Sequence, residues 1–364
     1  MRIKRRTAAL GAAVTALVAL VAASVVIGDA PGRPSPPAAA SAAPASLDDL
    51  PMGPETRVPW WQDGRLHVGQ TTIETRLELV HHANGTTVVG RSHVTRGSAW
   101  FLVRGSSLER LVTSRGPVSP EVSADGRTVV WVEAIAEDRR RITAYDVASG
   151  AETGSIEVPV ETFCCTGDGE LYLRGVTTDG RVVWSVDRTS FVWRPGEPTA
   201  VRVDMPGHQL AMDNWPGGLM WQGHGDSVFE LPGVLATVSE TGGVQRIGRV
   251  PTEDGRWSPD GSSYAYAGQA DGRSFAKAPR DHIWVQDIDS RETRLLDLPG
   301  GAPASLVSLV AWESRTAVIV GSWLPFDGGD DQHAGLQWLV RCDTGTGACE
   351  RVPGSPAGVP TFPT

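Results

Sequence analysis

The stretch Ser258-Pro-Asp-Gly-Ser-Ser-Tyr-Ala-Tyr266 decides the fold, because a polar turn is followed at once by a short apolar strand. Glycine tolerates positive φ, aspartate can hydrogen-bond the turn backbone, and aromatic residues suit a buried strand. The same arrangement occurs at Ser123-Ala-Asp-Gly-Arg-Thr-Val-Val-Trp131 and Thr178-Asp-Gly-Arg-Val-Val-Trp184, with weaker copies at 215–221 and 312–320. The chain therefore contains an internal repeat.

A second signature follows the first: a strand ends in a polar residue, a turn of four or five residues follows, and another strand begins. It occurs at residues 146–150, 239–243, 287–291 and 343–347. Aligned on their first residues, these copies are separated by 93, 48 and 56 residues, so the first interval spans two units. A period of roughly 45–55 residues is typical of a four-stranded propeller blade.

The sequence predicts an all-β fold, a β-propeller of four-stranded blades. Six complete blades are expected, at residues 77–114, 116–159, 161–204, 207–250, 252–299 and 302–354. The hairpin-like segment 60–73 either closes the ring beside the last blade or begins a seventh. Turn signals every ~8–12 residues also suit a β-sandwich, but the fixed period favours the propeller.

The N-terminus predicts export. Four basic residues within residues 1–6 precede Thr7–Gly28, an uncharged run rich in Ala, Val and Leu. As a helix this run would extend about 33 Å, which is enough to cross a bilayer and longer than the apolar core of a cleaved signal. We expect a signal anchor that leaves the rest of the chain outside the cytoplasm, with a cleaved signal peptide and a secreted protein as the alternative. The expected organisation is 1–28 signal segment, 29–55 Pro/Ala/Ser-rich linker, 56–356 propeller and 357–364 tail.

The four cysteines would then lie where disulfides persist. Cys342 and Cys349 flank Asp-Thr-Gly-Thr-Gly-Ala, a predicted tight turn, so we expect a disulfide across a hairpin. A zinc site would need more ligands than these two thiols offer. Cys164 and Cys165 leave two possibilities, a strained ring disulfide or two buried thiols, and the geometry of disulfides favours the thiols.

Charge and motifs exclude several functions. The net charge of −9 and the pI near 5.4 disfavour nucleic-acid binding. The sequence has no Gly-x-Ser-x-Gly motif and no HxxxH spacing, so we assign no catalytic, cofactor or metal residue. Trp131, Trp184 and Trp221 end equivalent strands; packing between blades explains them better than a ligand platform does. A polysaccharide hydrolase or lyase would need only two carboxylates, and Asp213 and Asp226 are candidates.

The predicted ligand face consists of two long insertions, each between the second and third strands of neighbouring blades. They are residues 269–282, with Arg273, Lys277 and Arg280, and residues 324–335, with Asp327, Asp330 and Asp331. Long loops on a rigid scaffold are where binding residues gather. The three aspartates form a candidate Ca²⁺ site, but solvated loops whose opposite charges pair across the blades are the favoured interpretation.

The Ser-Pro-Asp-Gly and Ser-Ala-Asp-Gly turns resemble the WD40-like (PD40) repeats of the TolB-type propeller family, over residues 56–356. The resemblance implies an exported binding platform. Gly217-Gly218 replaces Asp-Gly in the fourth blade, and the separate N-terminal α/β domain that TolB carries is missing, so TolB's roles in colicin uptake and outer-membrane assembly are not transferred. The excess of Arg, with only Lys4 and Lys277 as lysines, is similar to proteins of high-GC actinobacteria.

These observations predict a non-enzymatic, monomeric propeller. Its expected ligand is a protein or a cell-wall component, and its expected membrane contact is the N-terminal helix. Fold alone does not determine chemistry, so the polysaccharide hydrolase or lyase stays the alternative.

Overall fold

The computed structural model describes residues 49–362 apart from 78, 94–96, 161–170, 187–188, 205–210, 214, 223–232, 252–254, 268–281, 299–305, 324–335 and 354–361. In this part of the chain the regular elements are 27 β-strands. None of the described residues belongs to a helix that is long and apolar enough to cross a membrane. The predicted signal segment and most of the linker lie outside the described residues.

Six four-stranded antiparallel sheets follow one another along the chain, each with its strands in chain order. Their bounds are β4 (Leu79–Ala83), β5 (Thr86–His93), β6 (Gly97–Arg104) and β7 (Ser107–Ser114); β8 (Pro120–Val122), β9 (Thr128–Ala136), β10 (Arg139–Asp146) and β11 (Ala151–Pro159); β12 (Tyr172–Val176), β13 (Val182–Val186), β14 (Thr189–Trp193) and β15 (Val201–Arg202); β16 (Ala211–Asp213), β17 (Leu219–Gln222), β18 (Gly233–Val238) and β19 (Val244–Val250); β20 (Gly255–Trp257), β21 (Ser263–Ala267), β22 (Ile283–Asp287) and β23 (Thr293–Leu295); β24 (Leu306–Ser314), β25 (Ala317–Trp323), β26 (Leu336–Asp343) and β27 (Cys349–Arg351).

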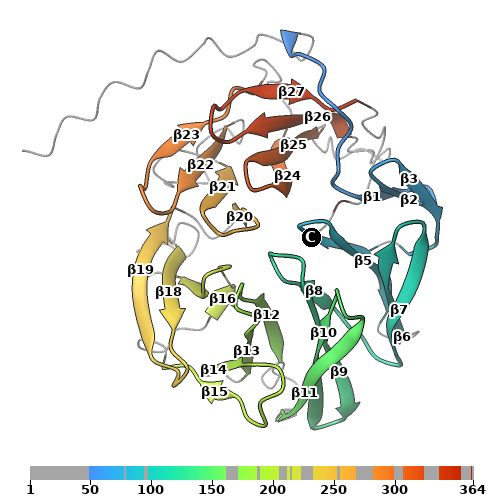
Figure 1. Ribbon diagram of the computed structural model, residues 1–364, viewed down its shortest axis with the longest axis vertical. Coiled ribbons are helices and arrows are strands. Elements are labelled where there is room, and N and C mark those ends of the chain that lie inside the picture. Colours follow the sequence, from blue (N-terminus) through green and yellow to red (C-terminus); the bar gives the residue numbers. More distant parts are fainter. Residues whose placement is uncertain are drawn as a thin grey trace, which may run out of the picture. The chain divides into compact units, whose positions relative to one another are not determined.

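A seventh sheet has three strands, β1 (Trp60–Gln62), β2 (Arg65–Val68) and β3 (Thr71–Glu74). The seven sheets surround a common axis, and the first strand of each four-stranded sheet lies nearest that axis (Figure 1). The fold is therefore a seven-bladed β-propeller. The six predicted blades are confirmed, and the hairpin-like segment forms the seventh blade.

The repeated turn joins the first and second strands of a blade, and its Ser or Thr has a role that the Asp-Gly pattern did not reveal. Ser258 Oγ donates to Asp260 Oδ1 at 2.8 Å and accepts the Ser263 N–H at 2.9 Å. Ser123 and Thr177 make the equivalent bonds in their own turns. Gly261 adopts φ +70°, which favours glycine. The hydroxyl thus ties the turn to the start of the next strand.

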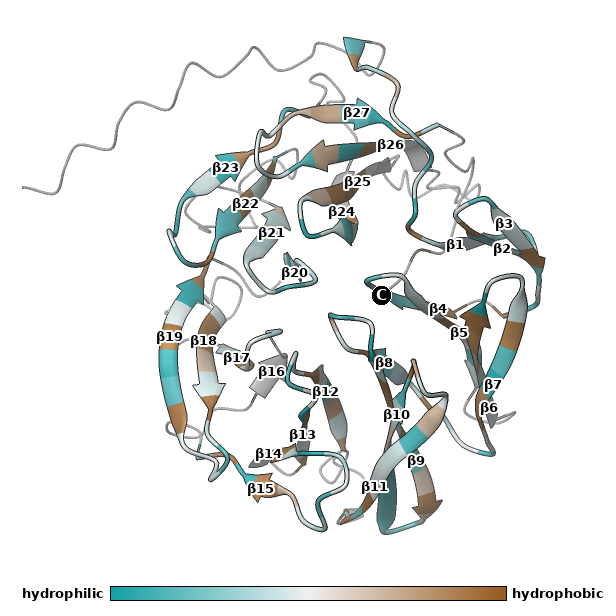
Figure 2. Ribbon diagram, in the orientation of Figure 1, coloured by the Kyte–Doolittle hydropathy of each residue, from teal (hydrophilic) through white to brown (hydrophobic). Residues whose placement is uncertain are grey.

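Large side chains fill the interfaces between neighbouring sheets. Trp100 and Trp131 share one buried cluster between the β4–β7 and β8–β11 sheets, and Trp184 and Trp193 belong to the cluster between the β8–β11 and β12–β15 sheets. Figure 2 shows hydrophobic colour along the strands and hydrophilic colour at many turns. Trp184 is 1% exposed, so burial of its indole is nearly complete. The expectation that tryptophans pack blades together is confirmed for Trp131 and Trp184, whereas Trp221 clusters with residues of its own sheet.

The Cys342–Cys349 disulfide is present. The two cysteines are direct partners across β26 and β27, and Asp343 Oδ1 accepts the Thr346 N–H at 2.7 Å within the turn between them. The predicted hairpin bridge is thus confirmed, while Cys164 and Cys165 lie outside the described residues.

Residues 50–58, here called the N-terminal strap, attach to the last sheet. Met52 forms a parallel bridge with Arg351, the Gly53 N–H donates to Arg351 O at 2.9 Å, and the Arg351 N–H donates to Pro51 O at 2.8 Å. The strap therefore adds an extended segment to the outer edge of β27 before the chain enters β1 (Figure 1). The strap thus covers the part of this edge at Arg351, where an uncovered strand could pair with another chain.

Candidate functional site: a cavity lined by the innermost turns

The insertions predicted to bind ligand lie outside the described residues, with Arg273, Lys277, Arg280, Asp327, Asp330 and Asp331. Asp226 also lies outside them, and Asp213 belongs to β16. The strand ends that flank the first insertion are described: Ala267 and Ile283 are partners at the end of β21 opposite its Asp260 turn. A surface at that end of β21 would therefore not be on the face of the propeller that carries the repeated turns.

The described cavity lies at the turn face, close to the axis. It has two adjoining parts, of about 190 Å³ and 690 Å³, which share His82, Asn84 and Pro259 in their walls. Turns between the first and second strands of six successive sheets contribute to the lining, through Asn84, Asp125, Thr178, Pro216, Pro259 and Ser314. We call it the mouth cavity. The volume of its larger part is in the range of small-ligand sites.

Hydrogen bonds between neighbouring turns hold this rim. Asn84 Nδ2 donates to Asp125 O at 3.0 Å, and the Thr178 N–H donates to Pro216 O at 2.7 Å. Trp215 Nε1 donates to Gly261 O at 3.0 Å. Each bond joins one blade to the next, so these neighbouring turns hold one another in place.

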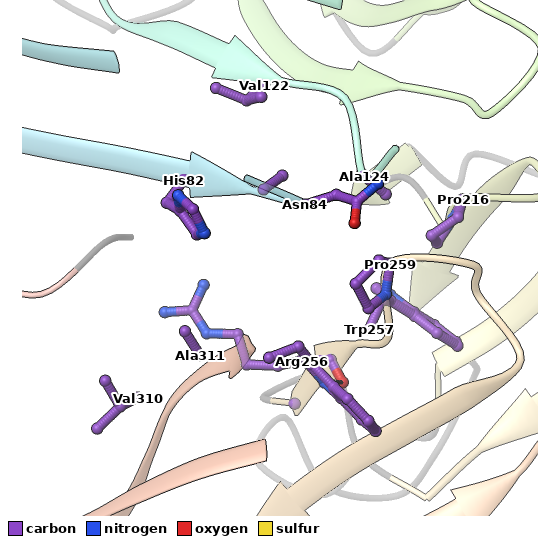
Figure 3. Close-up of a pocket in the computed structure, with 13 residues that line it drawn as sticks. His82, Asn84, Val122, Ala124, Pro216, Arg256, Trp257, Pro259, Val310 and Ala311 are labelled. Atoms are coloured by element: carbon purple, nitrogen blue, oxygen red, sulfur yellow. Dashed lines mark hydrogen bonds between the residues drawn. The ribbon is translucent and has the colours of Figure 1, made fainter. Parts of the chain in front are cut away.

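Trp312 makes a further bond between blades, since its Nε1 donates to Arg256 O at 2.9 Å. The walls beside it are apolar, with Val122, Trp257, Pro259 and Ala311 around the opening (Figure 3). The mouth cavity therefore combines an apolar wall with a polar rim, as ligand sites commonly do.

The carboxylates of the rim are all hydrogen-bonded within the protein. Asp125 Oδ1 accepts from Ser123 Oγ at 2.6 Å, and Asp260 Oδ1 accepts from both Ser258 and Ser262. Burial alone would raise the pKa of Asp260, but the hydrogen bonds from the two serines hold it below its usual value. Asp260 therefore stays ionised near neutral pH, and both carboxylates are committed to their own turns.

Glu313, the third carboxylate of the rim, has more hydrogen-bonding partners than Asp125 and Asp260. Its side chain is 6% exposed and forms a two-pronged ion pair with Arg341, through Arg341 Nη2 to Glu313 Oε1 at 2.9 Å and through Arg341 Nε to Glu313 Oε2. It also accepts from the Arg57 N–H and from Thr56 Oγ1. Burial alone would raise the pKa of Glu313, yet these bonds hold it below 4.5.

Three arginines border the cavity without such partners. Arg256 lines the smaller part, and Arg57 and Arg315 line the larger one. No side chain in the described part of the structure forms an ion pair with any of the three. Figure 3 shows the Arg256 side chain extending into the pocket on the side of His82.

His82 is the titratable group shared by both parts of the cavity. Its Nδ1 lies 2.9 Å from Thr87 Oγ1. Burial lowers the pKa of His82 to about 4, against smaller opposing effects of Thr86 and Glu313, so the imidazole is neutral near pH 7. The positive charge at the opening is thus carried by arginine.

Sequence reasoning missed this site because it sought function in long loops. The signal was present in the Asp-Gly turns, which defined the repeat and, in a ring of blades, must all meet near the axis. No group of three or more potential metal ligands is found among the described residues. The aspartates proposed for Ca²⁺ lie outside them.

The fold and the cavity together define a seven-bladed propeller with a pocket framed by its inner turns. No protein-family model matches the chain, and no curated protein matches it. Solved structures similar to it are propellers. TolB from Acinetobacter baumannii is 15% identical, with a TM-score of 0.40, over 78% of this chain and 68% of that one.

Two archaeal structures are similar at 10% identity. The β-propeller domain of the trilobed protease from Pyrococcus furiosus has a TM-score of 0.47, over 76% of this chain and 83% of that one. The acylaminoacyl peptidase of Pyrococcus horikoshii has a TM-score of 0.46, over 79% of this chain and 47% of that one. At these identities the likeness concerns the propeller fold alone.

Proposed function

We propose that this protein is a propeller-type binding module that acts outside the cytoplasm and takes its ligand, a protein or a cell-envelope component, at the mouth cavity. The observation that carries the proposal is the cavity itself, about 690 Å³ in its larger part and framed by turns from successive blades. Ligand sites are characteristically concave, partly apolar and largely pre-formed. The bonds between turns supply that pre-formed rim.

Binding is favoured over catalysis by the state of the carboxylates. A glycosidase needs two carboxyl groups free to reach the substrate, one of them able to donate a proton. Asp260 and Glu313 both have lowered pKa values and are engaged in hydrogen bonds. Neither is suited to act as a general acid near neutral pH. A polysaccharide hydrolase or lyase is therefore the second candidate.

Two features support action outside the cytoplasm. The Cys342–Cys349 disulfide suits an oxidising compartment, where such bonds persist. The basic residues before Thr7–Gly28 suit export, with the segment either retained as an anchor or removed. N-terminal sequencing of the exported protein decides between these two: a start beyond residue 22 means cleavage.

The binding proposal is tested by blocking the mouth cavity. Ala124 lines its smaller part within the Ser123 turn, so Ala124→Trp should fill the opening without removing a side-chain hydrogen bond. Ala151→Trp on the exposed strand β11 is the matched control. The full chain is screened against arrayed envelope glycans and peptides, with circular dichroism confirming the fold of each variant.

The expected result is a ligand that binds the wild type and the Ala151 variant, with loss of binding in the Ala124 variant. Equal binding by all three proteins would place the ligand elsewhere and refute the proposed site. Cleavage of an arrayed glycan that is lost only in the Ala124 variant would establish the enzyme instead.

A further inference from the structure

We propose that the mouth cavity selects an anionic group, a carboxylate or a phosphate, carried on an apolar body. The inference rests on the proposed function, since it names the ligand class of the same site. It starts from Arg57, Arg256 and Arg315, which border the cavity from three separate segments of the chain. Guanidinium groups bind carboxylate and phosphate through paired N–H donors in a fixed plane.

The three arginines stand out because they gather around one cavity and have no ion-pair partner among the described residues. The chain carries a net charge of −9, and some arginines elsewhere on its surface pair with acidic neighbours, as Arg104 does with Glu109 and Arg141 with Glu157. At the cavity, the described residues offer no such partner to the three guanidinium groups. A ligand anion would supply it.

The carboxylates of the rim do not cancel this charge. Glu313 is already neutralised by Arg341, and Asp125 lies 3.7 Å from Arg127. Asp260 remains, turned toward the hydroxyls of Ser258 and Ser262. When the arginines that pair with these carboxylates are counted as well, arginine side chains outnumber carboxylate side chains around the opening. The field there favours an anion although the protein as a whole is acidic.

The other residues of the cavity wall are the reason for proposing that the ligand carries an apolar body. Val122, Ala311 and Pro259 line the smaller part together with Arg256, and Figure 3 shows Ala311 next to the Arg256 guanidinium. Trp257 and Trp312 line the same part and offer aromatic surface. A bare ion would leave this surface uncovered, whereas an aryl or alkyl carboxylate covers it.

The test uses the full chain and three probes: 2-naphthoate, its neutral analogue 2-naphthamide, and inorganic phosphate. Binding is measured by calorimetry and by quenching of tryptophan fluorescence. Arg256→Gln removes one cation while keeping a polar side chain. Arg246→Gln, on the exposed outer strand β19, makes the same change of charge away from the cavity.

We expect saturable binding of 2-naphthoate to the wild type, at least tenfold weaker in the Arg256 variant and unchanged in the Arg246 variant, as expected for loss of a charge-assisted hydrogen bond. Saturable phosphate binding with the same dependence on Arg256 would assign a phosphate-bearing ligand, and its absence a carboxylate. Equal affinity for 2-naphthamide would overturn the anion preference and leave the proposed cavity standing. Absence of all binding, or equal loss in both variants, would overturn the inference itself.

Discussion

The interface between the β8–β11 and β12–β15 sheets and the seam between the β24–β27 and β1–β3 sheets are built differently. The former is made by strands on both sides, with Val130 and Ile142 facing Trp184 and Trp193. At the seam, the last sheet presents Ile319 and Leu339, and the residues packed against them include Val58 of the N-terminal strap and Phe362 near the C-terminus. The ring is thus closed by segments that belong to no blade.

Polar groups replace part of the apolar contact at the seam. Arg341, 11% exposed, bonds Glu313 and Glu350 and also donates to the carbonyls of Pro54 and Glu55 at 3.0 Å each. One guanidinium thereby joins three strands to the strap. The comparison teaches that repeated blades can rely on burial, whereas closure of this ring depends on a directional ion pair, whose contribution is sensitive to pH and to the loss of one partner.

The largest effect should come from the strand-built interface. Trp184→Ala should lower the free energy of unfolding by about 4 kcal/mol, because it empties space in a packed cluster. Trp184→Phe should cost less, since the indole N–H, which no described residue accepts, disappears while the ring contact remains. Urea unfolding of the three proteins measures this. Equal losses of stability in the two variants would show that the cluster does not depend on packing of an aromatic side chain at residue 184.

Arg341→Met should cost about 3 kcal/mol, by leaving Glu313 charged and buried without its partner. The loss should be local: amides of the strap, such as Gly53, should exchange hydrogen faster while β13 and β14 keep their protection. The double variant Glu313→Leu with Arg341→Met should recover part of the loss. Uniformly faster exchange in every blade would contradict a separate seam.

The disulfide lies beside the strap, on the last sheet. Replacing Cys342 and Cys349 by serine opens a short loop and should cost about 2–3 kcal/mol by the chain-entropy argument. The amide exchange of Arg351 and Gly53 should rise, because β27 carries the strap. If only the turn at Asp343 loosened, the hairpin bridge would have no part in closing the ring.

Glu313→Gln tests the electrostatic side of the comparison. Its pKa is lower in the folded protein than its ordinary value of 4.5, so its stabilising effect is present above pH 4.5 and is lost as pH falls through the folded pKa. We expect the variant to be less stable by about 2 kcal/mol at pH 7, with a difference that shrinks as the pH falls below 4.5. A difference independent of pH would mean that Glu313 acts through shape alone.

The blades could be predicted from sequence because each is specified locally: an Asp-Gly turn, an apolar strand and a fixed interval recur. The seam and the mouth cavity could not, because they depend on residues far apart in the chain. Arg341 meets Pro54, and Arg57 borders the same cavity as Arg315, with no local pattern to pair them. Only closure of the ring brings these residues together.

The smallest effect concerns the turn that defines the repeat. Ser258→Ala removes the hydroxyl that bridges Asp260 and the Ser263 N–H, so we expect a loss of about 1 kcal/mol. Because Asp260 borders the mouth cavity, the variant should also loosen the Trp215 contact to Gly261, seen as faster exchange at the rim but not at the strap. Thermal unfolding with hydrogen exchange measures both. Faster exchange of Gly53 in this variant would mean that rim and seam open as one unit, and the contrast between strand-built interfaces and the strap would then not extend to their dynamics.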